Sequence, residues 1–460
     1  MMTAPVSGIQ FIGTQRSGSN LLRVMLEQHP AIAAPHPPHL LHNFLPLLPL
    51  YEPLDKSNFK LLVSDMVDYV IANPVPWEGV SFDKDDIIAQ SRSYHIFEVF
   101  RLIYEAIAKA KGARYWCCKS MQNLFYSNAM EQHGLNLKYI FLYRDGRDVA
   151  LSFKKAIVGD KQVYYLAKQW KEEQDICLSL YKQYGSEKVF LLNYEKLVAA
   201  PEASMQGLCA FLEIDYRDSM LQYYNSDASK AAAAAGDMWK NLEKPVMKEN
   251  TQKFLKELTA DEIEIYEWVA KGTLTALGYS LYSSLSNPSL ISAEAIQGYQ
   301  QENAALKKQF MQTAPKNDLE KREVSAIAVK AGKAILEVYR SGEKIQVAIK
   351  ADYTPLTIAD QQSHHIIVQG LEAFNKNIPV LSEEGADISY EERKHWNEFW
   401  CVDPLDGTKE FINRRDEFTV NIALIRQGKP VLGVIYTPVY ETLYYGTAGR
   451  GSWKQKKGEA

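Results

Sequence analysis

The chain has 460 residues, of which 46% are hydrophobic and 23% charged, and its formal net charge is −4. This length predicts two to four domains, each large enough to bury its own core, and this composition excludes a wholly disordered protein. The weak negative charge gives no sign of a nucleic-acid partner, so any anion must bind to local basic groups.

The sequence also shows no membrane span, and no disulfide scaffold or signal peptide of a secreted protein. No uninterrupted apolar run reaches the roughly 18 residues of a membrane span, because the apolar segment 40–50 is short and contains Pro46 and Pro49. The five cysteines form no CxxC pair, and the first residues, MMTAPVSG, lack the basic and apolar character of a signal peptide. We therefore expect a protein of a reducing compartment, the cytoplasm.

The first functional pattern lies in residues 9–25, IQFIGTQRSGSNLLRVM. A short apolar run predicts a buried strand over 9–12, a tight loop follows from Gly13 to Gly18, and apolar residues then recur at helical spacing. At such a junction the free N–H groups of the first helical turn point at one spot, which suits a phosphate. Further donors come from Arg16 and from the hydroxyls of Thr14, Ser17 and Ser19.

This loop differs in one position from the phosphate loop of nucleoside triphosphatases. Its spacing, Gly13-x4-Gly18, is the same, but Ser19 stands where a lysine should follow the second glycine, and Arg16 lies inside the loop. A magnesium-ATP site needs that lysine. Three interpretations stay open on these residues alone: another kind of phosphate site, a P-loop kinase or triphosphatase, and a plain strand, turn and helix.

A proline-rich segment, residues 34–42 (APHPPHLLH), follows one helix later. Its prolines exclude a regular helix, and its histidines are at positions 36, 39 and 42. No acidic or cysteine partner lies nearby, which disfavours a metal site. Because imidazole titrates near neutrality, a general base is the functional hypothesis, and a surface loop with incidental histidines is the alternative.

A second strand, loop and helix unit lies at residues 138–153, KYIFLYRDGRDVALSF. An apolar strand, a turn and a helix from Asp148 onward repeat the βα pattern of a parallel sheet. Arg144 ends the strand, and Ser152 lies about two helical turns later on the same side. The two side chains can therefore grip a second phosphate; the alternative is an arginine that only pairs with Asp148.

Together the two units resemble the signature regions of sulfotransferases that use 3'-phosphoadenosine 5'-phosphosulfate (PAPS). Residues 14–20 are similar to the 5' loop of that family, and Arg144 with Ser152 have the spacing of its 3'-phosphate element. Further similarities lie at residues 189–197 and 259–279. The resemblance covers about residues 6–282 and implies an α/β domain, a P-loop-like parallel sheet flanked by helices.

The resemblance implies a role for each matching residue. Sulfuryl transfer is an in-line displacement whose charge spreads over the equatorial oxygens, so fixed cations and N–H donors matter most. Lys119, at the end of an apolar strand over 115–118, matches a lysine that stabilises the transferring group in some members. The 5'-phosphosulfate would be held by Arg16, Ser17, Gly18, Ser19 and Asn20 next to Thr14, and the 3'-phosphate by Arg144 and Ser152.

The departure from the family concerns the base. One branch has an acidic pair at the position of His36 and Pro37 in this chain. We therefore expect His36 to deprotonate the acceptor hydroxyl or amine, with His39 as its substitute, and Lys248 is a further candidate for a phosphate contact. The helix patterns do not identify the acceptor, whether small molecule, glycan or lipid.

A change in composition marks the second half of the chain. Residues 287–317 are rich in Gln, Lys and Glu with loosely spaced apolar residues, which predicts a connecting helix. An amphipathic helix is predicted over 318–340 and a strand over 344–350. The predicted domains are thus residues 1–285 and 318–460, joined by a helical linker over 286–317.

Acidic residues in this half follow apolar strands. The segment LSEEG follows the strand predicted over 378–381, and Asp403 and Asp406 follow the one predicted over 399–402. Isolated acidic residues usually mark a solvated surface, but carboxylates at strand ends converge on hard cations, which take oxygen ligands.

This half resembles the inositol monophosphatase superfamily, most closely its 3'(2'),5'-bisphosphate nucleotidases. The matching segments are TPLTIAD (354–360), PVLSEEG (379–385), WCVDPLDGTKEF (400–411) and FTVNIALI (418–425). The resemblance implies an α+β layered sugar-phosphatase-type domain, with one Mg2+ on Glu383, Asp403 and the Leu405 carbonyl and a second on Asp403 and Asp406. Asp360 and Thr408 would orient the attacking water.

The family domain continues well beyond Ala460, so we expect a partial domain that exposes apolar surface and has little or no nucleotidase activity alone. A fragment, a remnant and a half-domain completed by another chain are all open, and so is a homo-oligomer. Transfer from PAPS leaves 3'-phosphoadenosine 5'-phosphate (PAP), which the second family hydrolyses to AMP and phosphate. A non-catalytic module that senses PAP or mediates oligomerisation is the rival hypothesis.

Overall fold

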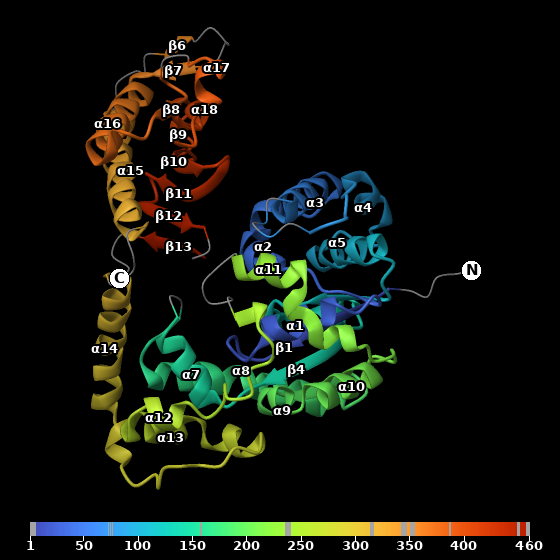
Figure 1. Cartoon of the computed structure of the whole chain (residues 1–460). Coiled ribbons are helices and arrows are strands. Elements are labelled where there is room, and N and C mark those ends of the chain that lie inside the picture. Colours follow the sequence, from blue (N-terminus) through green and yellow to red (C-terminus); the bar gives the residue numbers. More distant parts are fainter. Residues whose placement is uncertain are drawn as a thin grey trace. The chain divides into compact units, whose positions relative to one another are not determined.

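The computed structural model of the chain describes residues 6–71, 73, 75, 77–156, 159–234, 241–312, 317–341, 347–349, 355–385, 388–448 and 451–456. The chain divides into two compact units, Met1–Lys307 and Lys308–Ala460 (Figure 1). This division assigns most of the predicted linker to the first unit, and the domain limits at residues 285 and 317 stay predictions.

A parallel sheet of five strands forms the centre of the first unit, in the order β2-β3-β1-β4-β5. Its strands are β1 (Ser7–Ile12), β2 (Ile32–Ala33), β3 (Tyr115–Cys118), β4 (Lys138–Tyr143) and β5 (Val189–Asn193). Alternate residues face two different cores: Tyr115 and Cys117 belong to one, Trp116 and Cys118 to the other. Because both faces are buried, the strands have the continuous apolar runs seen in the sequence.

Helices cover both faces of this sheet (Figure 1). One core takes its helical residues mainly from α3 (Lys56–Ile71) and α5 (Ile96–Ala110), and the other from α1 (Ser19–Glu27), α9 (Tyr194–Ala199) and α10 (Pro201–Phe211). The other elements of the unit are α2 (Leu40–Phe44), η1 (Leu45–Tyr51), α4 (Lys84–Gln90), η2 (Met121–Tyr126), α6 (Ser127–Gln132), α7 (Gly146–Lys154), α8 (Val163–Tyr184), η3 (Asp218–Asn225), α11 (Asp227–Ala234), α12 (Phe254–Glu257), α13 (Ala260–Ala276), η5 (Pro288–Ile291) and α14 (Ala293–Gln312).

Helix α14, predicted as a connection, makes specific contacts with the first unit. The Asn303 side-chain oxygen accepts hydrogen bonds from the backbone N–H groups of Lys161 (2.8 Å) and Gln162 (3.0 Å). Its side-chain nitrogen donates to Asp160 (2.9 Å). The contacted segment lies at the N-terminus of α8, where free N–H groups need acceptors. α14 is therefore part of this unit's packing as well as a connection.

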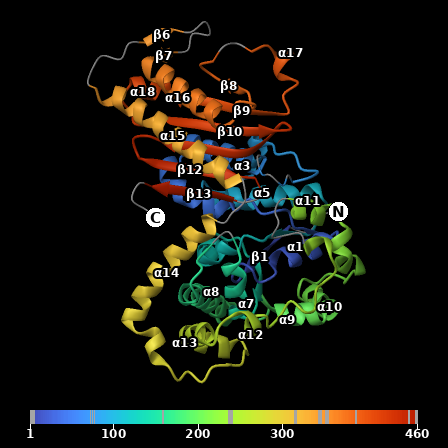
Figure 2. The same cartoon turned by 60° about the vertical axis from the view of Figure 1, so that its left-hand side comes forward.

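The second unit contains a six-stranded sheet in the order β13-β12-β11-β10-β9-β8, antiparallel except for the parallel pair β8 and β9. The predicted amphipathic helix is α15 (Asn317–Arg340), and Figure 2 shows α15 and α16 (Ile358–Asn375) lying across one face of the sheet. Ile435 and Tyr444, neighbours on β11 and β12, are exposed. The other elements are β6 (Val347–Ile349), β7 (Pro355–Thr357), β8 (Val380–Ser382), α17 (Tyr390–Arg393), β9 (Glu398–Asp406), α18 (Thr408–Ile412), β10 (Thr419–Arg426), β11 (Lys429–Thr437), β12 (Thr442–Thr447) and β13 (Gly451–Lys456).

Two sequence-based expectations need adjustment in this unit. Asp403 and Asp406 lie within β9 and not after it, because the strand continues through Pro404 with a register shift opposite Thr419 and Asn421. The strand predicted over 344–350 is described only at Val347–Ile349; the rest of it lies outside the described residues. None of the helices in the described ranges is both long and apolar enough to cross a membrane.

Candidate functional site

The loop between β1 and α1 has a conformation that depends on its two glycines. Gly13 and Gly18 have φ angles of 132° and 91°, in the region that side chains disfavour. A Cβ at Gly13 would lie 2.2 Å from the Leu142 carbonyl oxygen, and one at Gly18 would lie 2.6 Å from two ring carbons of Tyr194. Arg16 also has a positive φ, 71°, which is uncommon outside glycine and marks a constrained loop.

Several hydrogen-bonding groups of this loop have no partner among the described residues. α1 begins directly after Gly18 without a side-chain cap, so its first N–H groups are available to an anion. Ser17 is fully buried, and its hydroxyl has no hydrogen-bond partner among the described residues. The side-chain oxygen of Asn20 is likewise buried without a hydrogen-bond partner among the described residues. Thr14 differs, because its hydroxyl accepts a hydrogen bond from Gln174 on α8 (2.9 Å).

The loop between β1 and α1 forms hydrogen bonds with the predicted 3'-phosphate element, Arg144 and Ser152. Arg16 Nε donates to the hydroxyl of Ser152 on α7 (3.0 Å), and Arg144 Nη1 donates to the backbone oxygen of Arg16 (3.2 Å). Burial first, and the charge of Arg144 second, lower the pKa of Arg16. Arg16, Arg144 and Ser152 thus converge, and two nearby guanidinium groups form a positive region suited to a polyanion.

Arg144 has protein partners as well. Its Nη2 donates to the backbone oxygen of Asn250 (2.9 Å) and lies 3.7 Å from Asp148, and its guanidinium packs 4.5 Å from the centre of the Tyr194 ring. Its Nε is buried without a hydrogen-bond partner in the part of the chain that the structure describes. The pairing with Asp148 weighed from the sequence is therefore present, together with the convergence on the loop.

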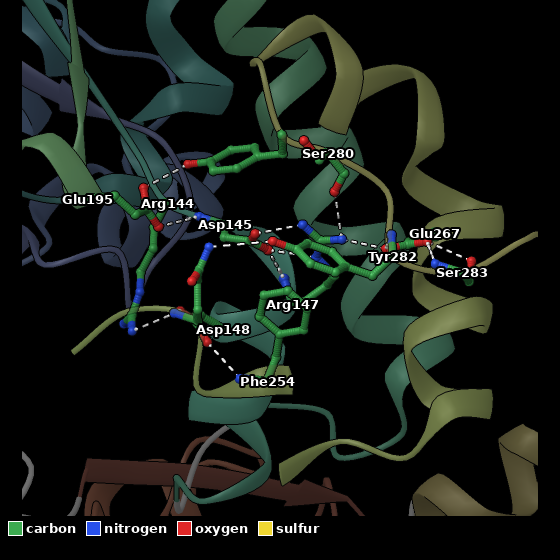
Figure 3. A network of polar contacts seen from close by, with 12 residues as sticks. Arg144, Asp145, Arg147, Asp148, Glu195, Phe254, Glu267, Ser280, Tyr282 and Ser283 are labelled. Atoms are coloured by element: carbon green, nitrogen blue, oxygen red, sulfur yellow. Dashed lines mark hydrogen bonds and ion pairs between the residues drawn. The ribbon is translucent and has the colours of Figure 1, made fainter. Parts of the chain in front are cut away.

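Asp148 also binds a second segment, residues 250–254, and this contact was not predicted from the sequence. Its carboxylate accepts hydrogen bonds from the backbone N–H groups of Gln252 (2.7 Å) and Phe254 (3.0 Å), as Figure 3 shows for Phe254. The side-chain nitrogen of Asn250 donates to the Tyr194 hydroxyl (2.8 Å). Residues 250–254 are thus fixed beside Arg144. No periodic signal marks such contacts, since their partners lie about a hundred positions apart.

A buried ionic network supports the start of α7 (Figure 3). Arg147 pairs with Asp145 (2.7 Å) and with Glu267 of α13, and all three side chains are nearly inaccessible to solvent. Burial lowers the pKa of Arg147, but the two carboxylates outweigh it and raise the pKa above its usual value. Glu267 also accepts hydrogen bonds from the backbone N–H groups of Tyr282 (2.9 Å) and Ser283 (2.8 Å). The network therefore joins α7, α13 and the segment after α13.

The predicted base, His36, and the predicted lysine, Lys119, are both influenced by the charge of Arg23. Lys119 follows β3, and burial together with the charges of Arg23 and Arg16 lowers its pKa to about 7. Burial, then the charges of Arg23, Lys119 and His39, lower the pKa of His36 to about 3. The expectation that this imidazole titrates near neutrality is therefore wrong for the ligand-free chain, because burial first, and nearby positive charge second, disfavour its protonated form. His36 is therefore neutral at pH 7, and a bound anion would favour its protonated form.

Asp360 and Thr408 of the second unit come together at the N-terminus of α16. The Thr408 hydroxyl donates to Asp360 (3.1 Å) and also lies 3.2 Å from the Leu405 carbonyl oxygen. The second carboxylate oxygen of Asp360, which is fully buried, accepts hydrogen bonds from the hydroxyl (2.5 Å) and the N–H (2.8 Å) of Thr357. A fixed carboxylate beside a hydroxyl is an arrangement that can orient a water molecule.

Three carboxylates lie near this pair. Burial, followed by the charges of Glu383 and Asp406, raises the pKa of Asp403 to about 7. One Asp403 oxygen is buried without a hydrogen-bond partner among the residues that the structure describes. Asp406 accepts a hydrogen bond from Asn421 (3.0 Å). Across the described ranges no three acidic, histidine or cysteine side chains are already gathered as a metal site. The donor set nevertheless fits a hard cation, because oxygen ligands with mutually repelling charges are stabilised by one.

Other residues fall outside these clusters or were missed. Lys248 is exposed, and its predicted phosphate contact stays untested. Arg23 was not predicted, although it is only 2% exposed and influences both Lys119 and His36. Its burial could not be predicted, because the sequence does not show which face of α1 packs against the sheet.

Family comparisons divide the chain in the same way. A model described as "Sulfotransferase family" matches residues 9–218, and one described as "Inositol monophosphatase family" matches residues 317–459. Among solved structures, a sulfotransferase domain from the Synechococcus PCC 7002 olefin synthase is 21% identical over 61% of this chain and 98% of its own, with a TM-score of 0.41. CysQ from Bacteroides thetaiotaomicron is 47% identical over 29% of this chain and 48% of its own, with a TM-score of 0.26.

Curated relatives match the second half. The 3'(2'),5'-bisphosphate nucleotidase CysQ of Salmonella typhimurium is 51% identical over 136 residues, which are 30% of this chain and 54% of that protein. The Escherichia coli K12 protein of the same name is 48% identical over 136 residues. The chain thus spans about half the length of the curated relatives it matches. Residues 9–218 are thus similar to the sulfotransferase family and residues 317–459 to the inositol monophosphatase family.

Proposed function

We propose that the first unit transfers a sulfuryl group from PAPS to an acceptor hydroxyl or amine, and that the second belongs to a magnesium-dependent PAP phosphatase. The observation that carries the first part is the meeting of Arg16, Ser152 and Arg144 beside a helix N-terminus without a side-chain cap. Two phosphate-binding elements at this junction suit a nucleotide with phosphates at both ends of its ribose.

In this proposal the loop residues hold the 5'-phosphosulfate through N–H groups and the hydroxyls of Ser17 and Ser19. Arg144 and Ser152 hold the 3'-phosphate. The Arg144 Nε has no protein partner within the described residues, which leaves it a donor for the ligand. Lys119 has a pKa of about 7 in the free chain. The bound sulfonate oxygens raise this pKa, so that Lys119 is protonated and stabilises the charge that develops on them.

His36 accepts the acceptor's proton as the acceptor oxygen or nitrogen attacks sulfur and the S–O bond to the 5'-phosphate breaks. A neutral imidazole is required for this step, and His36 is neutral above about pH 3 in the free chain. The negative charge of bound PAPS raises its pKa toward the range of an effective base. The acceptor class, whether small molecule, glycan or lipid, is left open by the proposal.

For the second unit, the similarity to proteins named 3'(2'),5'-bisphosphate nucleotidase supports PAP as its substrate. Mg2+ would be held by Glu383, Asp403, Asp406 and the Leu405 carbonyl, and a bound metal of this kind supplies Lewis-acid stabilisation of a phosphoryl oxygen. Asp360 and Thr408 would hold the attacking water between their oxygens. Removing PAP by a domain of the same chain that forms it would relieve product inhibition.

The five cysteines are all unpaired, and four of them are buried. Free thiols are typical of a reducing compartment, which supports placing the chain in the cytoplasm.

The test of sulfuryl transfer is the conversion of PAPS to PAP, measured by chromatography. The acceptors are a panel of phenols, sugars and amines. Acceptor-dependent PAP formation that falls at least about tenfold in Arg16→Gln supports the proposal. Full turnover by His36→Asn at neutral pH would remove His36 from the mechanism. The second unit is tested separately by AMP formation from PAP and Mg2+, with Asp403→Asn as the control.

A P-loop kinase or triphosphatase remains the second candidate, because the loop spacing of Gly13 and Gly18 is shared with that class. Ser19 in place of the lysine argues against it. Thermal stabilisation of the chain by magnesium-ATP, and not by PAP, would favour this candidate.

A further inference from the structure

The segment that carries His36 is held to α1 by both backbone groups of one residue. After β2 ends at Ala33, Arg23 Nη1 donates to the backbone oxygen of Ala34 (3.1 Å). The backbone N–H of Ala34 donates to the Glu27 carboxylate. Arg23 and Glu27 lie four residues apart, on one side of α1. Two neighbouring side chains of one helix thus bind the donor and the acceptor of one peptide segment, two residues before His36.

This helix is the one whose N-terminus forms the phosphosulfate loop. Contacts at Ala34 therefore set the distance between that loop and His36 through a single rigid element. The far side of the segment is also fixed, since Trp77 Nε1 donates to the backbone oxygen of His36 (2.8 Å). Glu27 is itself held by an ion pair with Lys111.

Arg23 is a costly residue for packing alone. It is 2% exposed, and its Nε and Nη2 are buried without a hydrogen-bond partner in the described ranges. Burial lowers its pKa, and the nearby carboxylate of Glu27 and the thiol of Cys117 only partly offset this. An apolar side chain at this position would avoid a buried charge with incomplete pairing. A function near the site explains why the charge is there.

We propose that Arg23 and Glu27 are positioning residues that clamp Ala34 and so fix His36 against the phosphosulfate loop. This rests on the proposed role of His36 as the base. Arg23 has a second effect, since its charge adds to burial in disfavouring the protonated imidazole of His36. The groups that face His36 electrostatically are Arg23, Lys119 and His39. Of these, Arg23 is the one that also holds the backbone of its segment.

The test uses the full chain and two measurements that need no acceptor. The first is the titration of His36 by NMR in protein labelled at its histidines, with the signal assigned from His36→Asn. The second is hydrogen exchange of the peptide that contains Ala34. The variants are Arg23→Gln, Arg23→Lys and Glu27→Gln, and Lys109→Gln is a control that removes an exposed charge outside the clamp.

We expect Arg23→Gln to raise the pKa of His36 by at least about one pH unit, because a nearby like charge is removed, and Arg23→Lys to restore most of the wild-type value. Glu27→Gln should speed exchange at Ala34 about tenfold, since one hydrogen bond to a charged acceptor is weakened. PAP affinity should change less than about twofold in all variants. The control should match the wild type in every measurement.

An unchanged His36 titration in Arg23→Gln together with unchanged exchange in Glu27→Gln would overturn the proposal. If Arg23→Gln does not fold, Glu27→Gln still tests the proposal, because it keeps the size of the side chain, and unchanged exchange at Ala34 in this variant then overturns it. Failure of the proposed function looks different: His36→Asn then keeps full turnover while the clamp measurements come out as expected.

Discussion

Replacing Gly18 with alanine perturbs the proposed phosphosulfate loop at the point where it enters α1. An alanine there keeps a φ near 91° only with strain, and its Cβ would lie 2.6 Å from two carbons of the Tyr194 ring. Either the loop or the ring must therefore move. Because the ring also packs against Arg144, with 4.5 Å between guanidinium and ring centre, its movement disturbs the 3'-phosphate element too.

The magnitude follows from these contacts. The left-handed conformation costs an alanine about 1 to 2 kcal/mol. Displacing the loop weakens at least one hydrogen bond to a charged phosphate, worth about 1.5 to 3 kcal/mol. Gly18→Ala should thus weaken PAP binding roughly 10- to 100-fold.

Calorimetric titration of PAP into the intact chain measures this effect, and Gly112→Ala is its matched control. Gly112 also has a positive φ, 62°, but a Cβ there would meet nothing within 4 Å. Gly112→Ala should lose about 1 to 2 kcal/mol of stability and Gly18→Ala at least as much, whereas only Gly18→Ala should lose PAP affinity. Equal PAP affinity in the two variants would refute the assignment of this loop as the phosphate site.

Three further predictions follow from buried contacts. PAP binding should raise the pKa of His36 by at least about one pH unit from about 3, because phosphate charge offsets the surrounding cations, and an unchanged NMR titration would contradict this. Glu267→Gln should lower the stability of the first unit by about 3 kcal/mol in scanning calorimetry, while exposed Lys271→Gln should not, and equal melting temperatures would count against the network. Asn303→Ala should destabilise the same transition by about 1 kcal/mol relative to exposed Gln301→Ala; no difference would make α14 a passive connection.

The sequence allowed correct prediction of those elements whose signal is local. The segments 9–25 and 138–153 form the predicted strand, loop and helix units, because buried parallel strands require apolar runs and the loop requires Gly13 and Gly18. The helix predicted over 318–340 is α15, whose apolar spacing reflects its contact with the sheet.

Features that depend on tertiary contacts were not predictable in this way. Asp148 binds the backbone of Gln252 and Phe254 across about a hundred residues, and no periodicity encodes such a contact. The same holds for His36: its residue type suggests a pKa near neutrality, but burial and the charges of neighbouring elements determine the value.

The measurement that tests the central claim most directly is calorimetric titration of the intact chain with PAP in the presence of a chelator, compared with a separate titration with magnesium-ATP in a buffer that contains Mg2+ and no chelator. Removing the divalent metal eliminates PAP binding at the proposed metal-dependent site of the second unit, so that the titration measures PAP binding by the first unit. The account predicts one PAP bound per chain, at least about 100-fold more tightly than magnesium-ATP, and a loss of this binding in Arg16→Gln. Tight binding of magnesium-ATP with none of PAP would contradict it and identify the loop as a nucleoside triphosphate site.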